Sequence, residues 1–135
     1  MSESMSFHDP EKLAAVDYPY VSRIPAGMEL LFLAGSCPLD KEGRVPYPND
    51  YAEQAKLCVE NIKTVLAESG GTLESVVYTR ILVASNNRED LVTVWRAVRD
   101  ALGEHNAPST LTGVTVLGYE DQLVEIEAVA AVKQG

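Results

Sequence analysis

The sequence predicts an α+β fold, a two-layer sandwich in which two helices cover one face of a β-sheet. Two segments with apolar residues at helical spacing, Tyr51–Glu68 and the stretch after Asn87, alternate with segments rich in β-branched and aromatic residues. The predicted order is β-β-α-β-α-β-β, and helices of this length cover one face of a sheet. A length of 135 residues indicates one domain, residues 18–135, preceded by an N-terminal arm, residues 1–17.

Two strands and a loop are predicted in the first third of the domain. Residues 18–24 and the dense apolar run at residues 30–34 have the composition of strands, and the turn formers at residues 25–27 separate them. We therefore expect these two strands to form a hairpin. Gly35 ends the second strand, and residues 37–48 are rich in Pro, Gly and charged residues, which is typical of a loop.

The two helices carry clear start and stop signals. Asn49 or Asp50 can cap the helix that begins at Tyr51, and glycines follow its end. Asn87 can cap the second helix, and Gly103 stops it. Both helices have an apolar stripe at a period of 3.6 residues, so each is expected to bury one side against the sheet.

Three further strands are predicted around and after the second helix. Residues 73–84 contain many β-branched and aromatic residues, which favours a buried strand between the helices. Residues 109–117 and 123–132 follow the second helix, with a turn at residues 118–122 between them.

The last strand carries two carboxylates. Glu125 and Glu127 are two residues apart, so both side chains point to the same face, and Val124, Ile126 and Ala128 point to the other. The carboxylate face must meet water, a partner subunit or a functional site, because burying an unpaired charge is costly. Taken alone, this pattern favours a solvated strand face with two structural carboxylates.

Composition and charge exclude several function classes. The net charge is −9 and no basic patch is visible, so nucleic-acid binding is not expected. Cys37 and Cys58 are too few and too far apart for a zinc site, and no signal peptide precedes them, so we expect reduced thiols in the cytoplasm. No run reaches the roughly 18–20 apolar residues of a membrane helix. No metal, cofactor or membrane partner is therefore expected.

Isolated residues with catalytic potential give weak signals. His105 follows the second helix and is interpreted as a C-terminal cap more readily than as a base. Ser36 and Thr110 have no histidine at a motif spacing, so a hydrolase triad is unsupported. Cys37, beside Gly35, is interpreted as a small buried apolar residue more readily than as a nucleophile. Neither a phosphate loop nor a dinucleotide fingerprint is present.

Four segments together resemble one known family. They are LLFLAGSCPLDKEG at residues 30–43, YAEQAKLCVENIKTVLAESGGTLESVV at 51–77, GEHNAP at 103–108 and VEIEAVA at 124–130. In their order and spacing the chain resembles the Rid family of reactive-intermediate (enamine/imine) deaminases, also called YjgF or L-PSP endoribonuclease-like proteins. The resemblance covers Tyr20 to about Val132, which is nearly the whole domain.

The resemblance implies a chorismate-mutase-like fold and a homotrimer with a central barrel, whose subunit interfaces form three clefts for a small molecule. Members without metal or organic cofactor hydrolyse 2-aminoacrylate-like enamines and imines to keto acids and ammonia. In those members an arginine pairs with the substrate carboxylate, and a glutamate on the last strand positions the attacking water.

Carried over to this sequence, the family pattern assigns the water-positioning glutamate to Glu125, and Tyr20 and Gly35 to the lining of the cleft. The arginine position holds Thr110, and a position that is often polar in the second helix holds Trp95. Thr110 offers one hydroxyl and no charge, so the missing arginine removes a charge-assisted pair. The sequence leaves open whether a neighbouring subunit delivers an arginine, with Arg80, Arg96 and Arg99 as the candidates.

Three functional hypotheses follow. The first is an imine or enamine hydrolase whose substrate lacks the usual carboxylate, in which Glu125 positions water. Thr110, Ser36 and the backbone near Gly35 would bind the ligand, and 2-aminoacrylate deamination is not expected. The second is a non-catalytic member that binds a small molecule or partner protein in the same cleft. The third, ribonuclease activity, fits poorly with the acidic charge.

Overall fold

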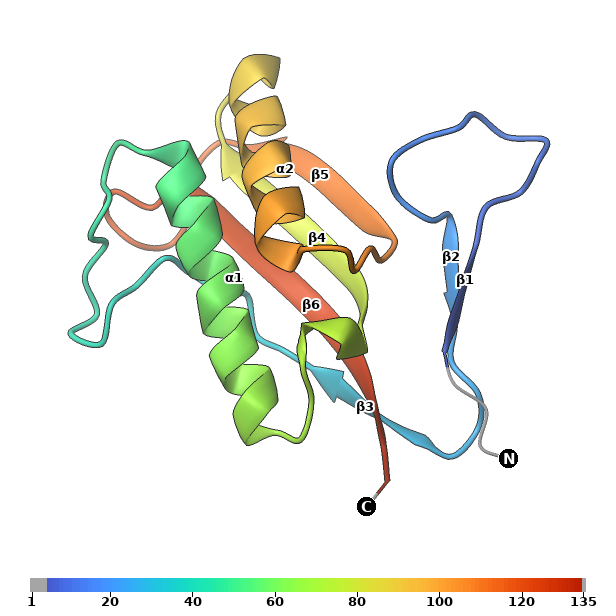
Figure 1. The fold of residues 1–135 in the computed structure, drawn as a ribbon. Coiled ribbons are helices and arrows are strands. Elements are labelled where there is room, and N and C mark those ends of the chain that lie inside the picture. Colours follow the sequence, from blue (N-terminus) through green and yellow to red (C-terminus); the bar gives the residue numbers. More distant parts are fainter. Residues whose placement is uncertain (1–4, 135) are drawn as a thin grey trace.

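A four-stranded sheet with both helices on one face forms the body of the protein in a computed structural model that describes residues 5–134 (Figure 1). The strands are β3 (Met28–Phe32), β4 (Val76–Ala84), β5 (Ser109–Val114) and β6 (Val124–Lys133), in the order β3-β6-β4-β5. Strand β6 pairs antiparallel with β3 and β4, and β4 pairs parallel with β5. The predicted α+β sandwich is confirmed.

The two helices begin and end where their local signals predict. Helix α1 spans Tyr51–Glu68, and the Asp50 side chain accepts a hydrogen bond from the backbone N–H of Glu53. Helix α2 spans Arg88–Leu102 with Asn87 as its N-cap. Gly103 ends α2 at a φ of 69°, in the left-handed region that glycine adopts without strain.

The hydrophobic core lies between the helices and the sheet. Each large aliphatic side chain buried there contributes about 1.5–3 kcal/mol relative to an exposed one. The last strand follows the predicted alternation, because its even-numbered residues from 124 to 130 are buried and its odd-numbered ones are half-buried. The core side chains include Cys58, Ile62 and Leu66 from α1, Val94 and Val98 from α2, Ile81 and Val83 from β4, and Val124 and Ile126 from β6.

The predicted hairpin in the first third of the domain is wrong. Strand β2 (Val21–Arg23) pairs with β1 (Ser6–His8) in a separate two-stranded sheet, which Figure 1 shows beside the main sheet. Strand β3 pairs with β6 instead. A strand as short as β2 has the same local pattern with either partner, so packing outside the strand decides the pairing.

The N-terminal arm packs against the segment that follows α2. Trp95 Nε1 donates a hydrogen bond to Asp17 Oδ2 at 2.7 Å, and Asn106 Nδ2 donates to the Asp17 carbonyl at 2.7 Å. The Phe7 ring meets the His105 ring edge-on. His105 Nε2 lies 2.7 Å from the Val76 carbonyl oxygen, so this side chain joins the start of β4 and does not serve as the expected helix cap.

Smaller differences concern the ends of strands. The predicted strand at residues 73–84 begins with a single 3₁₀ turn, Leu73–Ser75, capped by Thr72. The predicted strand at residues 109–117 ends at Val114. Strand ends are set by pairing with neighbours, which the local sequence does not encode.

Candidate functional site

The site forms on the face of the main sheet that the helices leave uncovered. Glu125 and Glu127 point to this face, as their spacing predicts. In the pairing of β6 with β4, Leu82 lies opposite Glu125 and Arg80 lies opposite Glu127. In the pairing of β4 with β5, Thr110 lies opposite Arg80. Three strands therefore bring one threonine, one arginine and two carboxylates to the same face.

Two donors hold one oxygen of the Glu125 carboxylate. Cys37 Sγ donates to Glu125 Oε1 at 3.3 Å, and Gln122 Nε2 donates to the same oxygen at 3.3 Å. The other oxygen lies beside Gly35, where a Cβ atom would overlap Oε2 and lie 2.7 Å from Cδ. Position 35 therefore has to be glycine for the carboxylate to occupy this place.

The segment that carries Gly35 is fixed across β6 by backbone hydrogen bonds. Ser36 N donates to the Ile126 carbonyl at 2.7 Å, and Ile126 N donates to the Ser36 carbonyl at 3.0 Å. Ser36 Oγ donates to the Cys58 carbonyl of α1 at 2.7 Å. The Ser36 hydroxyl therefore faces the helix layer, on the side of the sheet opposite to Glu125.

The buried side chain of Gln54 fixes the turn that carries Gln122. Gln54 Nε2 donates to the carbonyl of Asp121 at 2.9 Å and to that of Tyr47 at 2.7 Å. Gln54 Oε1 accepts from Leu123 N at 2.7 Å. Helix α1 thereby sets the position of the turn before β6, and with it one of the two donors to Glu125.

The thiol of Cys37 is a hydrogen-bond donor at neutral pH. Desolvation by burial and the adjacent Glu125 carboxylate raise the pKa of Cys37 to about 11. The thiol therefore stays protonated and donates to the carboxylate. Burial also raises the pKa of Cys58, which lies in the core behind the site.

Thr110 is exposed on β5 and pairs with a neighbouring hydroxyl. Its Oγ1 accepts a hydrogen bond from the Tyr78 hydroxyl at 3.0 Å. Tyr78 lies two residues before Arg80 in β4 and points to the same face. Position 110 thus presents hydroxyl groups where the family pattern has a cation.

Tyr20 and Trp95 belong to a separate aromatic cluster at the N-terminal arm. The Tyr18 ring centroid lies 5.8 Å from that of Trp95 and 6.2 Å from that of Tyr20, whose hydroxyl donates to the Ala14 carbonyl. Within residues 5–134, neither Tyr20 nor Trp95 has a hydrogen bond or ring contact with Glu125. Their place in a cleft depends on a partner subunit and stays a prediction.

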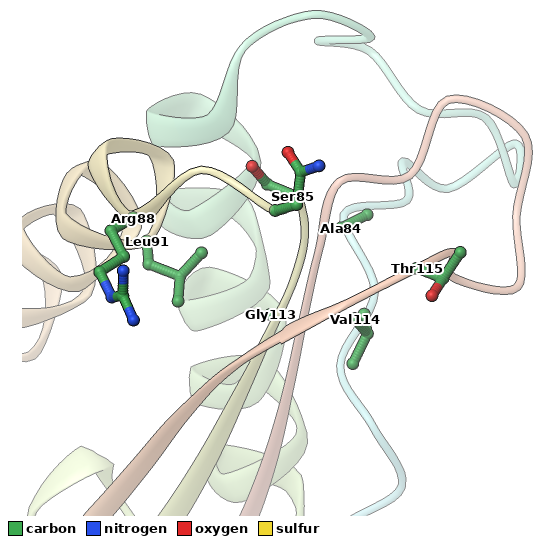
Figure 2. A pocket seen from close by; sticks show the side chains of 8 residues that line it. Ala84, Ser85, Arg88, Leu91, Gly113, Val114 and Thr115 are labelled. Atoms are coloured by element: carbon green, nitrogen blue, oxygen red, sulfur yellow. The ribbon is translucent and has the colours of Figure 1, made fainter.

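A hollow of about 620 Å³ lies at the carboxyl ends of the parallel strands β4 and β5 (Figure 2). Gly113 of β5 lies close to the backbone of Ser85, because a Cβ atom at position 113 would lie 2.7 Å from the Ser85 carbonyl oxygen. Glu125 is not among its lining residues, so this hollow is distinct from the carboxylate site. The residues around it include Ala84, Ser85, Arg88, Leu91, Val114 and Thr115.

Two contributors to the site were not predicted. Cys37 was interpreted as a buried apolar residue, but it is half-buried and binds Glu125. Its only sequence signal is its place two residues after Gly35. Gln122 lies in a turn with no motif. Among residues 5–134 no group of His, Cys, Asp and Glu is arranged to hold a metal, and no helix is long and apolar enough to cross a membrane.

Comparison with known proteins identifies the family. The model of the endoribonuclease L-PSP family matches residues 11–132. The chain belongs to the YjgF/L-PSP/Rid family. A RutC family protein of Pyrococcus abyssi is 32% identical over 112 residues, which are 83% of this chain and 85% of that protein. The 2-iminobutanoate/2-iminopropanoate deaminase of Escherichia coli K12 is 29% identical over 123 residues, 89% of this chain and 92% of the deaminase.

Solved Rid structures share the fold. A Rid family protein from Yersinia pestis has a TM-score of 0.86 at 22% identity, covering 96% of this chain and all of that one. A YjgF family member from Mycobacterium tuberculosis has a TM-score of 0.64 at 30% identity, with 96% of this chain and all of that one covered. The expected chorismate-mutase-like α+β fold is thereby confirmed.

Proposed function

We propose that this Rid protein hydrolyses a small imine or enamine to a carbonyl compound and ammonia, with Glu125 positioning the attacking water. The observation that carries the proposal is the setting of its carboxylate. Cys37 and Gln122 hold Oε1, while Oε2 lies against Gly35 and accepts no hydrogen bond from any described residue. An oriented carboxylate with one free oxygen is suited to bind and polarise a water molecule.

The proposed reaction adds water across the C=N bond. Glu125 Oε2 accepts a proton from the water as the water oxygen bonds to the imine carbon and the C=N π bond breaks, and Glu125 then returns this proton to the nitrogen to give a carbinolamine. The carbinolamine then loses ammonia, and its hydroxyl becomes the carbonyl group. The substrate and one water molecule thus give one carbonyl product and one ammonia molecule, without an oxidant or reductant.

The comparisons support this class of substrate. The Escherichia coli relative is a deaminase of 2-iminobutanoate and 2-iminopropanoate. Thr110 offers no charge, so position 110 alone favours an imine without the usual carboxylate, and 2-iminobutanoate can serve as a substrate only if another residue of the site supplies a cation. We further propose that the cleft lies between subunits of a homotrimer and that the reaction needs no cofactor. The protein is proposed to act in the cytoplasm.

Release of ammonia from 2-iminobutanoate, generated in the assay, tests the proposal. We expect the wild-type protein to accelerate the release, and the Glu125→Gln variant to lose roughly 10²–10⁴-fold of that rate, the usual contribution of a general base. Full activity in Glu125→Gln would contradict the role of Glu125.

Non-catalytic binding is a second candidate function, because position 110 lacks a cation. The chain would then bind a small molecule or partner protein in the cleft without turning it over. In that case the imine or its keto product would raise the melting temperature of the protein without being consumed. Any ammonia release above the uncatalysed rate, lost in Glu125→Gln, would exclude this alternative.

A further inference from the structure

We propose that Arg80 supplies the cation of the site, and that the substrate therefore carries an anionic group next to its imine. This inference deepens the proposed function, because it rests on the use of the Glu125 face of the sheet. The anionic group of the substrate would then bind at β4, the strand next to the one that carries Thr110.

The strand register brings Arg80 beside Glu127 and Thr110 and close to Glu125. Arg80 is paired with Glu127 on one side and with Thr110 on the other. Neighbouring strands lie about 4.8 Å apart, and diagonal neighbours on one face lie roughly 7–8 Å apart. Glu125 on β6 is the diagonal neighbour of Arg80 on the adjacent strand β4. A small ligand placed between the two side chains therefore touches both of them.

The Arg80 guanidinium has free donors. The residue is exposed, and within residues 5–134 its side chain makes no hydrogen bond or ion pair, although Glu127 lies opposite it. The Tyr78 and Thr110 hydroxyls, joined at 3.0 Å, lie at its side. A planar fork with all of its donors free, flanked by two hydroxyls, is suited to a carboxylate, which accepts two parallel hydrogen bonds.

With the cation at Arg80, Thr110 no longer implies a substrate without a carboxylate. Threonine is shorter than the arginine of the family pattern, and Arg80 lies opposite it on β4. The substrate class is then a small 2-imino acid, with its carboxylate on Arg80 and its C=N carbon near the water held by Glu125. The protein would thus keep its specificity for an anionic substrate, with the cation on β4 and not on β5.

Binding of 2-oxobutanoate, compared with binding of its neutral amide, tests the inference without turnover. The dissociation constants are measured by ligand-observed NMR for the wild type, for Arg80→Thr, and for the exchange variant Arg80→Thr/Thr110→Arg. Threonine suits a strand position, so the sheet is expected to be kept. Arg96→Gln is the matched control, because it removes an equally exposed arginine from α2 with the same change in net charge.

We expect the wild type to prefer the acid, and Arg80→Thr to lose roughly 30-fold or more in affinity for the acid but little for the amide. The exchange variant should recover the preference, and Arg96→Gln should keep it. Three results would overturn the inference: equal affinity of the wild type for acid and amide, no binding of the acid, or an unchanged preference in Arg80→Thr. If Arg80 only balanced Glu127, its loss would change both affinities alike, which also contradicts the inference.

The two proposals fail separately. Arg80-dependent preference for the acid in a protein that releases no ammonia would refute the proposed hydrolysis and leave the role of Arg80 intact. Ammonia release that needs Glu125 but keeps the same KM for 2-iminobutanoate in Arg80→Thr would refute the role of Arg80 alone.

Discussion

At the scale of single residues, Glu125 takes its place from three neighbours, of which Cys37 and Gly35 are distant in sequence and Gln122 is three residues away. Cys37 and Gln122 donate to Oε1, and the missing side chain at Gly35 leaves space for Oε2. The carboxylate is thus held in one orientation before any ligand arrives, which lowers the cost of ordering it during a reaction. Cys37 and Gln122, to which the family pattern assigns no role, therefore orient Glu125, the residue that the pattern assigns as catalytic.

The pKa of Cys37 gives a pH-dependent prediction at this scale. Burial and the Glu125 carboxylate raise that pKa from 9.0 to about 11, so at pH 8 the thiolate fraction is roughly 100-fold lower than for an unperturbed thiol. Alkylation of Cys37 by iodoacetamide, followed by mass spectrometry, should be slow at pH 8 and accelerate up to about pH 11. Because folding favours the protonated thiol, this contribution to stability is complete below pH 9 and is lost as the pH rises towards 11.

The Glu125→Gln variant provides the control for the thiol. It removes the charge that opposes thiolate formation, so alkylation of Cys37 should become faster at a given pH. Cys58 is fully buried and should stay unlabelled in the folded protein. An alkylation profile with its midpoint near pH 9 in the wild type would show that Cys37 is neither desolvated nor in contact with the Glu125 carboxylate.

At this scale the sequence revealed part of the site. The alternation of β6 and the family resemblance together identified Glu125, and the family pattern identified Gly35, which lies against it. Cys37 lies 88 residues from Glu125 in sequence, and this contact depends on the pairing of its segment with β6. No local pattern encodes such a pairing, so this donor could be found only in the structure. Gln122 is three residues from Glu125, but no motif marks it as a donor.

At the scale of elements, α1 links the core to the site. Gln54 has no exposed surface, and its side-chain amide makes three hydrogen bonds to backbone groups of two loops. Both helices could be predicted to the residue because caps and apolar periodicity are local. The pairing of β2 could not be predicted, because β3 lies nearer to β2 in sequence than β1 does, and packing outside the strands nevertheless selects β1.

Replacement of Gln54 by Leu should destabilise the fold. It removes the partner of the Leu123 N–H and of the Asp121 carbonyl, whereas the Tyr47 carbonyl still accepts from the Asp50 N–H, and a buried polar group left without its partner costs about 1–3 kcal/mol. The free energy of unfolding, measured by urea denaturation, should fall by this amount. Lys56→Ala is the control on the same helix, where an exposed pair with Glu53 is worth less than about 1 kcal/mol. A Gln54→Leu variant as stable as the wild type would contradict this account.

At the scale of the whole molecule, the uncovered face of the sheet carries apolar as well as polar groups. Phe32 is 77% exposed and Leu30 is 46% exposed, and both lie on β3 in register with β6 residues of that face. Exposed apolar side chains that gather on one face indicate a contact surface. The family resemblance makes a second and third copy of this chain the expected partners, and the completed cleft would then include the groups around Glu125.

Sedimentation equilibrium tests the assembly. We expect the wild type to have about three times the chain mass of 14.7 kDa, and Phe32→Lys to sediment as a smaller species because a charge on this face opposes association. Val65→Lys is the control, since Val65 is 47% exposed on α1, away from the uncovered face, and the variant should remain a trimer. A monomeric wild type, or an unchanged mass for Phe32→Lys, would contradict the prediction.

The most direct measurement of the central claim compares two carboxylates of the same strand. Glu125 and Glu127 share one face of β6, but only Glu125 is held by Cys37 and Gln122 beside Gly35. Ammonia release from 2-iminobutanoate is measured for Glu125→Gln and Glu127→Gln at equal concentration and equal oligomeric state. We expect a rate at least roughly 100-fold lower for Glu125→Gln than for Glu127→Gln. Equal rates in the two variants would contradict it.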